Sequence, residues 1–351
     1  MALTIALHAS LFTEAPTTVC RDDEWTVTAS RTGRGVAVLT VANSRGEIEL
    51  LPFMGQIIWG ARFDGIDLRM QNMFDEPRPA TEIVDTYGCF AFHAGLLASG
   101  CPAPEDTHPL HGEFPCMELD CAEVTIGDDR LTVTSTGEYV QGFGAHYTAS
   151  PSLTMHAGRG TFDIALSVTN LSAYAPMPLQ YMCHMNYAFV PGATMSQSLP
   201  AGTFRLRETV PAHVVPTPRW EELNRHILAG ELDPDSLEGA EEFDPEIVYF
   251  ADDLPSYGEH AEFVMHAPEG HRFITRFSTR ELPSATRWIL HNPDQKVAAF
   301  ALPATSRPEG RLAAERAGTL IMLPAGETRR FHVRTGLLAP GEDIQKENDA
   351  R

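Results

Sequence analysis

The feature that most constrains the fold of this chain is a segment in which large apolar side chains recur at every second position. Within residues 161–169, these side chains are Phe162, Ile164, Leu166 and Val168. The positions between them are polar or small. A β-strand places successive side chains on opposite faces of a sheet, so this period of two predicts a strand with one buried face.

Shorter segments with the same alternation recur along the chain, at 36–41, 131–136, 272–279 and 331–335. Residues that favour turns separate such segments at 43–46 and 127–129, and the second of these predicts a hairpin. Strands are therefore frequent from near the start of the chain to near its end. This distribution is typical of an all-β protein.

One segment has helical spacing instead. Its apolar residues are Trp220, Leu223, Ile227 and Leu228. Prolines precede them and Gly230 follows, which predicts one short surface helix. The acidic stretch after this helix, through Asp253, is interpreted as a solvated loop that leaves the main fold.

Neither a Pro/Ser-rich linker nor a repeat of fixed period divides the 351 residues. Hydrophobic residues make up 43% of the chain, enough for a substantial core. Large all-β sandwiches often exceed the usual domain size, so we predict a single antiparallel β-sandwich over residues 1–340. The charged segment 341–351 is predicted to be a frayed tail.

The formal charge of the chain, −21, restricts its partners. Such a surface repels nucleic acid and anionic membranes, whereas a neutral small molecule is unaffected. No segment approaches the roughly 20 apolar residues of a membrane span. The first residues lack the basic and apolar regions of a signal peptide, which favours a cytoplasmic protein. The six cysteines form no C-x-x-C pair and are expected to be reduced, mostly buried thiols.

The segment 88–118 concentrates side chains that can do chemistry. They are His93, Glu105, Asp106, His108, His111, Glu113 and Glu118. Gly, Pro and Ala dominate the rest of the segment, so it is predicted to be an ordered loop, and such loops often carry function.

Two interpretations of these histidines stay open. His108, His111 and Glu113 have side chains that suit zinc or iron, but their spacing matches no standard metal motif. The favoured alternative is hydrogen bonding to ligand hydroxyls or to the backbone, without a metal. A further histidine, His184, lies in an apolar and aromatic segment beside Asn186. Partial burial there would bring its pKa into the range of a general acid or base.

Four segments together resemble the galactose mutarotases (aldose 1-epimerases). The segment 110–112 resembles their histidine-glycine motif, and 184–187 resembles their second histidine motif. The segments 49–59 and 323–327 resemble an early strand with its glycine turn and the turn before the last strand. The closer resemblance is to the subgroup of unknown function named DUF4432. That subgroup shares the His-rich loop, the segment 282–288 and the Pro-Ala-Thr…Glu-Gly-Arg residues that begin at Pro303.

This resemblance implies a galactose mutarotase-like supersandwich that binds a small-molecule sugar and needs neither a metal nor a cofactor. By the same resemblance, His111 binds the sugar and His184 is the general acid on the ring oxygen. A glutamate late in the chain removes the anomeric proton, the ring opens, and closure on the other face gives the other anomer. Further sugar-binding residues are expected at His93, Glu113, Asn186 and Arg307.

The chain departs from the mutarotases where that glutamate is expected, because Leu302 stands there (Pro303 on a shifted alignment). Neither residue can accept a proton. Glu309 is the first candidate for a relocated base, and Glu113 and Asp294 are others. The basic residue that mutarotases carry before the first histidine is also not evident in the segment 88–100.

Three functions remain open. The first is an aldose 1-epimerase-like isomerase that uses a relocated base. The second is a carbohydrate-binding or regulatory protein that kept the cleft and lost the reaction. The third is a keto-sugar isomerase or lyase, in which His93, His108 and His111 would hold a metal. The sequence identifies neither the sugar nor the oligomeric state. A homodimer is compatible with it.

Overall fold

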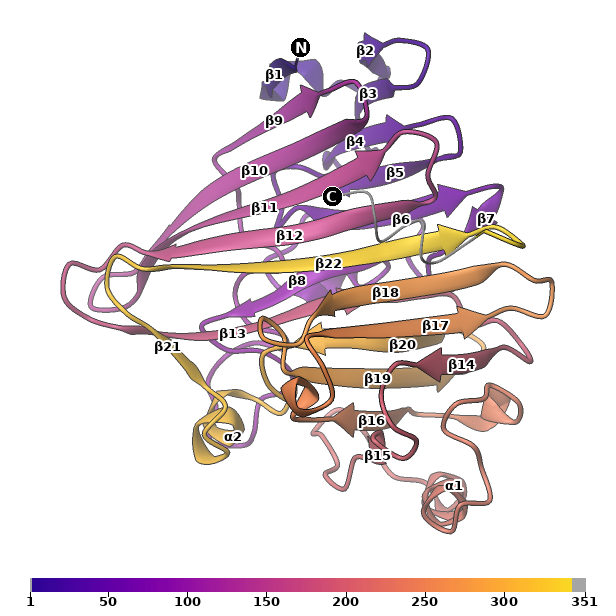
Figure 1. Cartoon of the computed structure of the whole chain (residues 1–351). Coiled ribbons are helices and arrows are strands. Elements are labelled where there is room, and N and C mark those ends of the chain that lie inside the picture. Colours follow the sequence, from indigo (N-terminus) through magenta and orange to yellow (C-terminus); the bar gives the residue numbers. More distant parts are fainter. Residues whose placement is uncertain (1, 343–351) are drawn as a thin grey trace.

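The computed structural model describes residues 2–342, which form two antiparallel sheets packed face to face (Figure 1). The front sheet of Figure 1 contains, in spatial order, β1 (Leu3–Leu7), β9 (Cys121–Ile126), β10 (Arg130–Val140), β11 (His146–His156), β12 (Thr161–Asn170), β22 (Thr328–Leu338), β18 (Arg272–Ser278), β17 (His260–His266) and β14 (Thr194–Gln197). The predicted all-β sandwich is confirmed.

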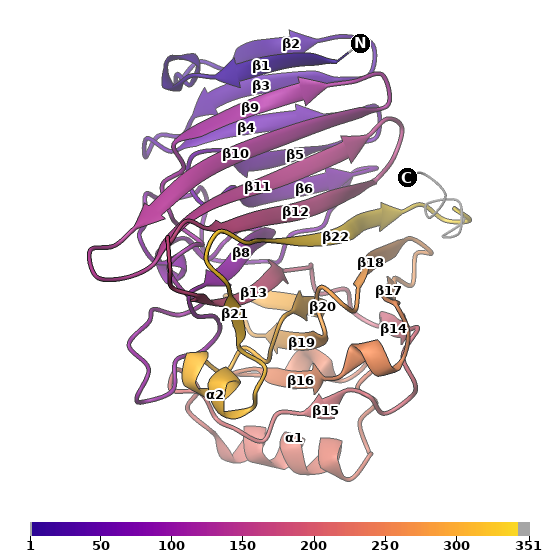
Figure 2. The ribbon, with the colours of Figure 1, turned by 60° about the vertical axis from the view of Figure 1, so that its left-hand side comes forward.

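The back sheet contains, in spatial order, β15 (Arg205–Leu206), β16 (Ile247–Ala251), β19 (Ser284–His291), β20 (Lys296–Ala304), β13 (Met177–Met185), β8 (Ala91–Leu96), β6 (Ile57–Phe63), β5 (Gly46–Leu51), β4 (Ala37–Ala42), β3 (Thr26–Arg31) and β2 (Thr17–Arg21). Two short strands lie beside this order: β21 (Ile321–Leu323) pairs with β13, and β7 (Ile66–Asp67) pairs with β6. Figure 2 shows the two sheets as successive layers.

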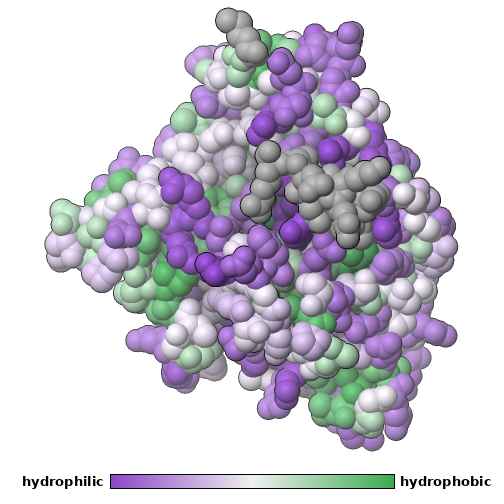
Figure 3. All heavy atoms as spheres, viewed as in Figure 1, coloured by the Kyte–Doolittle hydropathy of each residue, from purple (hydrophilic) through white to green (hydrophobic). Residues whose placement is uncertain are grey.

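The alternation predicted for 161–169 is that of β12. Phe162 is fully buried and stacks on Phe63 of the other sheet, with 5.8 Å between ring centroids. On β22, Thr335 is the register partner of Phe162, and its Oγ1 lies 2.6 Å from the Tyr187 hydroxyl. The polar alternate positions of the front sheet face outward, and Figure 3 shows that face covered largely by hydrophilic residues. One continuous apolar core therefore joins the two sheets.

The predicted helix is α1 (Pro218–Leu228), where the Thr217 hydroxyl accepts a hydrogen bond from the backbone N–H of Trp220 at 3.1 Å. Trp220, Leu223 and Ile227 are buried, but Leu228 is exposed because it lies off their stripe. A second helix, α2 (Arg311–Arg316), was not predicted. Short 3₁₀ turns occur at Ala9–Leu11, Ile83–Thr86, Ala240–Glu242 and Leu254–Ser256.

The interpretation of the acidic stretch as a solvated loop is wrong for its last part. Residues 247–251 form β16, in which every residue is buried, next to β19. The strand is difficult to recognise in the sequence because charged residues directly precede it. The predicted tail 341–351 lies outside the described residues from 343 onward, while Glu342 accepts hydrogen bonds from Arg45 at 2.9 and 3.1 Å. Within residues 2–342, no helix has the length and apolarity to cross a membrane.

Candidate functional site

The structure brings His111 and His184 together from distant segments. Their ring centroids are 4.7 Å apart and the planes are nearly perpendicular. His184 lies on β13, whereas His111 lies in the loop between β8 and β9. His111 has a φ of 62°, and Gly112 follows with a φ of 83°. A Cβ on Gly112 would lie 2.1 Å from the carbonyl oxygen of Ala98, so only glycine allows the turn that aims His111.

Aromatic side chains surround this histidine pair. Phe92, opposite His184 on the neighbouring strand β8, stacks on the His184 ring with 4.6 Å between centroids. The Tyr87 hydroxyl lies 3.2 Å from His184 Nε2. Trp288 of β19 contacts the rings of both His184 and Tyr87, at 5.7 and 6.0 Å. Apolar faces and a few polar atoms thus meet at one place, as in many small-molecule sites.

Burial makes both histidines neutral, and it corrects the expectation that the pKa of His184 lies in the range of a general acid or base. It lowers the pKa of His184 to about 3, although the nearby carboxamide of Asn186 acts in the opposite direction. Burial and the neighbouring histidines also hold the pKa of His111 well below its ordinary value. At neutral pH each imidazole therefore offers one N–H and one lone pair, which suits the hydroxyl groups of an uncharged ligand.

At the histidine pair and on the neighbouring strand β19, three buried polar atoms have no hydrogen-bond partner among the described residues. They are His111 Nδ1, His184 Nδ1 and Thr286 Oγ1. Nearly all buried polar groups in proteins are satisfied, so such atoms mark a place where a ligand or water donates or accepts hydrogen bonds. Thr286 pairs with Leu302 of β20, and Leu302 is 1% exposed. Ala304, two residues further along β20, pairs with Met182 of β13, so Leu302 lies beneath the site near His184.

A carboxylate that the sequence analysis missed lies at the edge of this site. Glu246 Oε2 accepts a hydrogen bond from Trp288 Nε1 at 2.7 Å, and its Oε1 accepts one from Arg207 at 2.7 Å. His213 Nε2 lies 3.5 Å from the same Oε1 atom. His213 and Arg207 keep the pKa of Glu246 below its usual value despite burial, which acts in the opposite direction. The sequence feature that could have pointed to Glu246 is the apolar segment 247–251 directly after it, which is typical of a buried strand.

Glu309 and Arg307 lie on the segment that follows β20. Thr209 donates a hydrogen bond to Glu309, and Arg307 lies 3.9 Å from the same carboxylate. Arg307 also pairs with Asp252 at 2.5 Å. Glu309 forms an isolated β-bridge with Gly100, whose carbonyl oxygen accepts a hydrogen bond from the backbone N–H of His111. The structure thus places Glu309 beside the loop that carries His111.

Other sequence candidates have different surroundings. His93 follows Phe92 on β8 and points to the opposite face, where its Nδ1 lies 2.9 Å from the Tyr181 hydroxyl. Glu113 accepts hydrogen bonds from Tyr147 and from backbone N–H groups of the loop, and it lines a separate groove of about 940 Å³. Asn186 donates to the carbonyl oxygen of Cys89 at 2.9 Å.

Asp294, the last candidate for the base, is exposed in the turn between β19 and β20, at the opposite end of β20 from Leu302. His108 Nδ1 lies 2.8 Å from the carbonyl oxygen of Pro109. No three His, Cys, Asp or Glu side chains within residues 2–342 are grouped to hold a metal ion, and His93 does not join His108 and His111.

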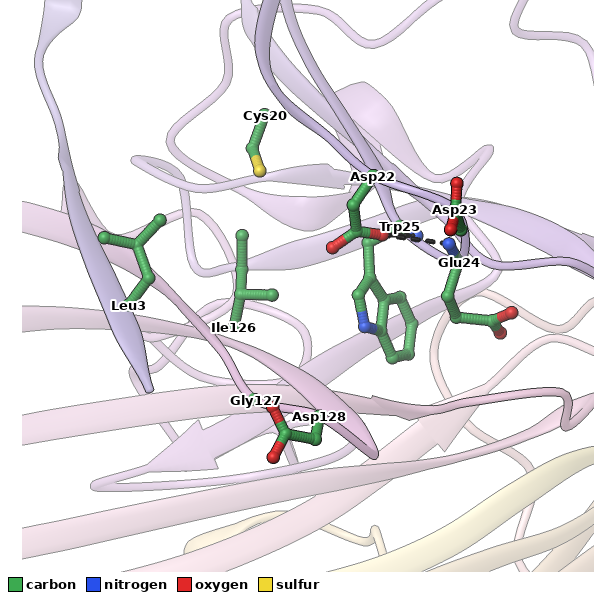
Figure 4. A pocket seen from close by; sticks show the side chains of 9 residues that line it. All are labelled: Leu3, Cys20, Asp22, Asp23, Glu24, Trp25, Ile126, Gly127 and Asp128. Atoms are coloured by element: carbon green, nitrogen blue, oxygen red, sulfur yellow. Dashed lines mark hydrogen bonds between the residues drawn. The ribbon is translucent and has the colours of Figure 1, made fainter. Parts of the chain in front are cut away.

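A pocket of about 410 Å³ lies at the N-terminal edge of the sandwich, away from the histidines (Figure 4). Asp22, Asp23 and Asp128 make it acidic, and Trp25 forms part of its wall. The Asp22 carboxylate accepts hydrogen bonds from the backbone N–H groups of Glu24 and Trp25 at 2.9 and 2.6 Å. These contacts stabilise the turn before β3.

The chain matches the sequence profile of a family described as a domain of unknown function (DUF4432) over residues 33–337. A search of curated proteins finds no match. Among solved structures, the fold resembles a candidate aldose 1-epimerase from Klebsiella pneumoniae, with a TM-score of 0.79 and 17% identity over 97% of this chain and 92% of that one.

Two further structures resemble this chain less closely. A galactose mutarotase-like protein from Clostridium acetobutylicum has a TM-score of 0.60 and 12% identity over 90% of this chain and 99% of that one. A candidate mutarotase from Salmonella typhimurium has a TM-score of 0.60 and 9% identity over 92% and 97% of the two chains. At these identities the likeness establishes a mutarotase-like fold.

Proposed function

This chain belongs to the DUF4432 family, and on that premise we propose that it binds a neutral sugar over His111 and His184 and interconverts its anomers by acid–base ring opening. The observation that carries this proposal is the buried histidine pair, with ring centroids 4.7 Å apart and an unpartnered Nδ1 on His111. Sugar hydroxyls can satisfy both rings, whereas an apolar ligand would leave them unpaired.

The close approach of the two rings determines where a sugar would lie. A separation of 4.7 Å leaves no room for a pyranose ring between them, so both histidines contact the sugar from the same side. The aromatic surfaces of Tyr87 and Trp288 suit the apolar face of a sugar ring. Mutarotation also needs a proton acceptor for the anomeric hydroxyl, and Leu302 cannot supply one.

The sequence offers Glu309 as the candidate for this proton acceptor. Thr209 and Arg307 hold its carboxylate. In this proposal His184 interacts with the ring oxygen, His111 binds hydroxyls, and Arg307 and Asn186 help to shape the site. His93 and Glu113 are left in structural roles, since their polar atoms are engaged with Tyr181 and Tyr147.

Anomer exchange measured by NMR saturation transfer tests the proposal on the full-length protein, across a panel of neutral aldoses. We expect exchange above the buffer rate. The His184→Ala variant should lose about 100-fold or more of this rate while it still binds the sugar in calorimetry. His226→Ala is the matched control, because His226 is an exposed histidine on α1 that pairs with acidic residues.

One observation favours a second function, a carbohydrate-binding protein without catalysis, and it is the apolar Leu302 beneath the histidine pair. Tight binding of an aldose, with exchange in no member of the panel above the buffer rate, would support that function and reject the isomerase.

A further inference from the structure

Glu246, at the edge of the histidine pair, has both carboxylate oxygens engaged by its own protein. Its Oε2 accepts a hydrogen bond from Trp288 Nε1 at 2.7 Å, and its Oε1 accepts one from Arg207 at 2.7 Å. His213 Nε2 lies 3.5 Å from the same Oε1 atom. Glu246 is only 7% exposed. A buried carboxylate bonded in this way is suited to holding its neighbours in place rather than to binding a ligand.

Strand register explains why Trp288 and Glu246 meet. Val248 of β16 is the register partner of Trp288 on β19. Glu246 precedes Val248 by two positions, so its side chain lies on the same face as Trp288 and diagonal to it. The pairing of β19 with β20 also shifts register between Thr286 and Trp288, and irregularities of this kind re-aim side chains. The pairing of the strands therefore brings the indole within reach of the carboxylate.

Two other elements fix the position of Glu246. Trp220 of α1 donates a hydrogen bond from its Nε1 to the backbone carbonyl oxygen of Glu246 at 2.7 Å. Arg207, directly after β15, donates its backbone N–H to the carbonyl oxygen of Val248 at 2.8 Å. The Arg207 side chain is 8% exposed and pairs with the carboxylate. The backbone and the side chain of Glu246 are thus both held.

The charge on Glu246 strengthens its bond to Trp288. Burial acts to raise the pKa of this carboxyl, but His213 and Arg207 hold the pKa below its ordinary value. The carboxylate is therefore ionised at neutral pH, and its hydrogen bond to the indole is charge-assisted. The indole N–H is the only polar group of a tryptophan side chain, so Trp288 offers the site its aromatic surface alone.

That aromatic surface lies beside the atoms that indicate a ligand. The Trp288 ring contacts the rings of His184 and Tyr87, with 5.7 and 6.0 Å between centroids, and Trp288 is partly exposed. His184 Nδ1 and His111 Nδ1 are buried and unpartnered among the described residues. A sugar can pack its apolar face on such a ring while its hydroxyls reach the histidines.

We propose that Glu246 is a positioning residue, which holds the Trp288 indole beside His184 as the surface on which the sugar ring packs and does not itself contact the sugar. This surface is called the platform below. The proposal deepens the proposed function and rests on it. The platform contacts the sugar equally in the ground state and the transition state, so its loss weakens binding and leaves the chemical step nearly unchanged.

A double-variant cycle on the full-length protein tests this role. Glu246→Leu removes the acceptor and Trp288→Phe removes the indole N–H. Each change should raise KM for anomer exchange roughly 10-fold, with kcat within about threefold of the wild type. The variant with both changes should have a KM within about twofold of that of Trp288→Phe, because Glu246 acts only through the indole. Effects that multiply, to roughly 100-fold in KM, would show that Glu246 contacts the sugar directly and overturn the proposal.

Tryptophan fluorescence provides a readout without any sugar. The difference between the emission of the wild type and that of Trp288→Phe isolates Trp288 from the other tryptophans. The same difference in the Glu246→Leu background should be shifted and more strongly quenched by acrylamide, because the released indole moves. Glu259→Leu is the matched control, since Glu259 pairs with Arg280 at an exposed position, and it should change neither the emission nor KM. An unchanged Trp288 emission in Glu246→Leu would overturn the proposal.

Glu246→Leu leaves Arg207 without its buried partner, which lowers stability. If circular dichroism shows this variant unfolded, Arg207→Met/Glu246→Leu takes its place in the cycle, because it removes both charges. Exchange of no aldose, together with a shifted Trp288 emission, would reject the proposed function and the sugar platform, while Glu246 would still hold Trp288. Exchange with a KM that Glu246→Leu leaves unchanged would reject the platform and retain the proposed function.

Discussion

At the scale of single residues, the backbone conformation at a few positions orients the side chains of the candidate site. His111 adopts a left-handed conformation that residues other than glycine rarely adopt. The adjoining Gly112 packs its Cα against the backbone of Ala98 and Gly95. Conformations of this kind persist only where the surrounding structure holds them. The histidine is thus directed at His184 by loop geometry, whereas His184 is directed by the ordinary alternation of β13.

Leu302 is the residue whose replacement most directly tests the missing carboxylate. Leu302→Glu puts an acceptor beneath the histidine pair, so we expect it to raise the anomer exchange rate above that of the wild type. Because the side chain is buried, the free energy of unfolding should fall by about 3 kcal/mol. Exchange by NMR and urea denaturation measure the two effects.

Leu302→Gln is the control, since it has nearly the same shape without the charge. A folded, sugar-binding Leu302→Glu variant with no rise in exchange over Leu302→Gln would show that a carboxylate here does not serve the reaction.

At the scale of elements, the segment between β14 and β17, residues 198–259, is called the excursion here, and it supplies the carboxylate at the edge of the site. The excursion contains α1 and β16, and it brings Glu246 to the edge of β19, which carries Trp288. On the opposite face of β19, Arg287 is fully buried and pairs with Asp235 at 2.6 Å. Its guanidinium also donates to Gln197 and lies over the Phe204 ring. Arg287 therefore fastens the excursion to the sandwich.

Arg287→Met should destabilise the protein by about 3–5 kcal/mol, because it leaves the Asp235 carboxylate without its buried partner. The measurement is urea denaturation, with limited proteolysis to detect opening of residues 231–240. Arg280→Met is the matched control, since Arg280 pairs with Glu259 at an exposed position. Equal stabilities of the two variants would show that Arg287 does not hold the excursion.

At the scale of the whole molecule, the two sheets share one core. Phe63 and Phe162 stack across the interior, and Tyr187 joins the back sheet to Thr335 of the front sheet. The back sheet runs without interruption from β15, near α1, to β2, near the N-terminus (Figure 1). The single domain predicted over residues 1–340 stays a proposal, which the following measurement tests.

A single domain is expected to unfold in one cooperative step. We therefore expect one transition in differential scanning calorimetry, with equal calorimetric and van't Hoff enthalpies. Two resolved transitions, in a protein whose melting is reversible, would divide the chain into independent units and contradict the single-domain prediction.

The sequence by itself determined the strands and the two histidines. Alternation is a local property, and the segments at 131–136, 161–169 and 331–335 lie within β10, β12 and β22. The hydrophobic pattern was not recognisable next to charged residues. For this reason the sequence analysis interprets β16 as part of a loop and does not predict α2. The motifs of His111 and His184 were also recognisable, since each occupies a few consecutive residues.

Only the tertiary structure decided which side chains share a face and which partners they meet. Phe92 and His93 are neighbours in sequence, yet one stacks on His184 and the other bonds Tyr181 on the opposite side. Arg207, Glu246 and Trp288 come from three separate segments and meet through hydrogen bonds to the Glu246 carboxylate, and no local pattern relates them. The physical reason is that periodicity reports burial of one face, whereas a site depends on the packing of segments distant in sequence.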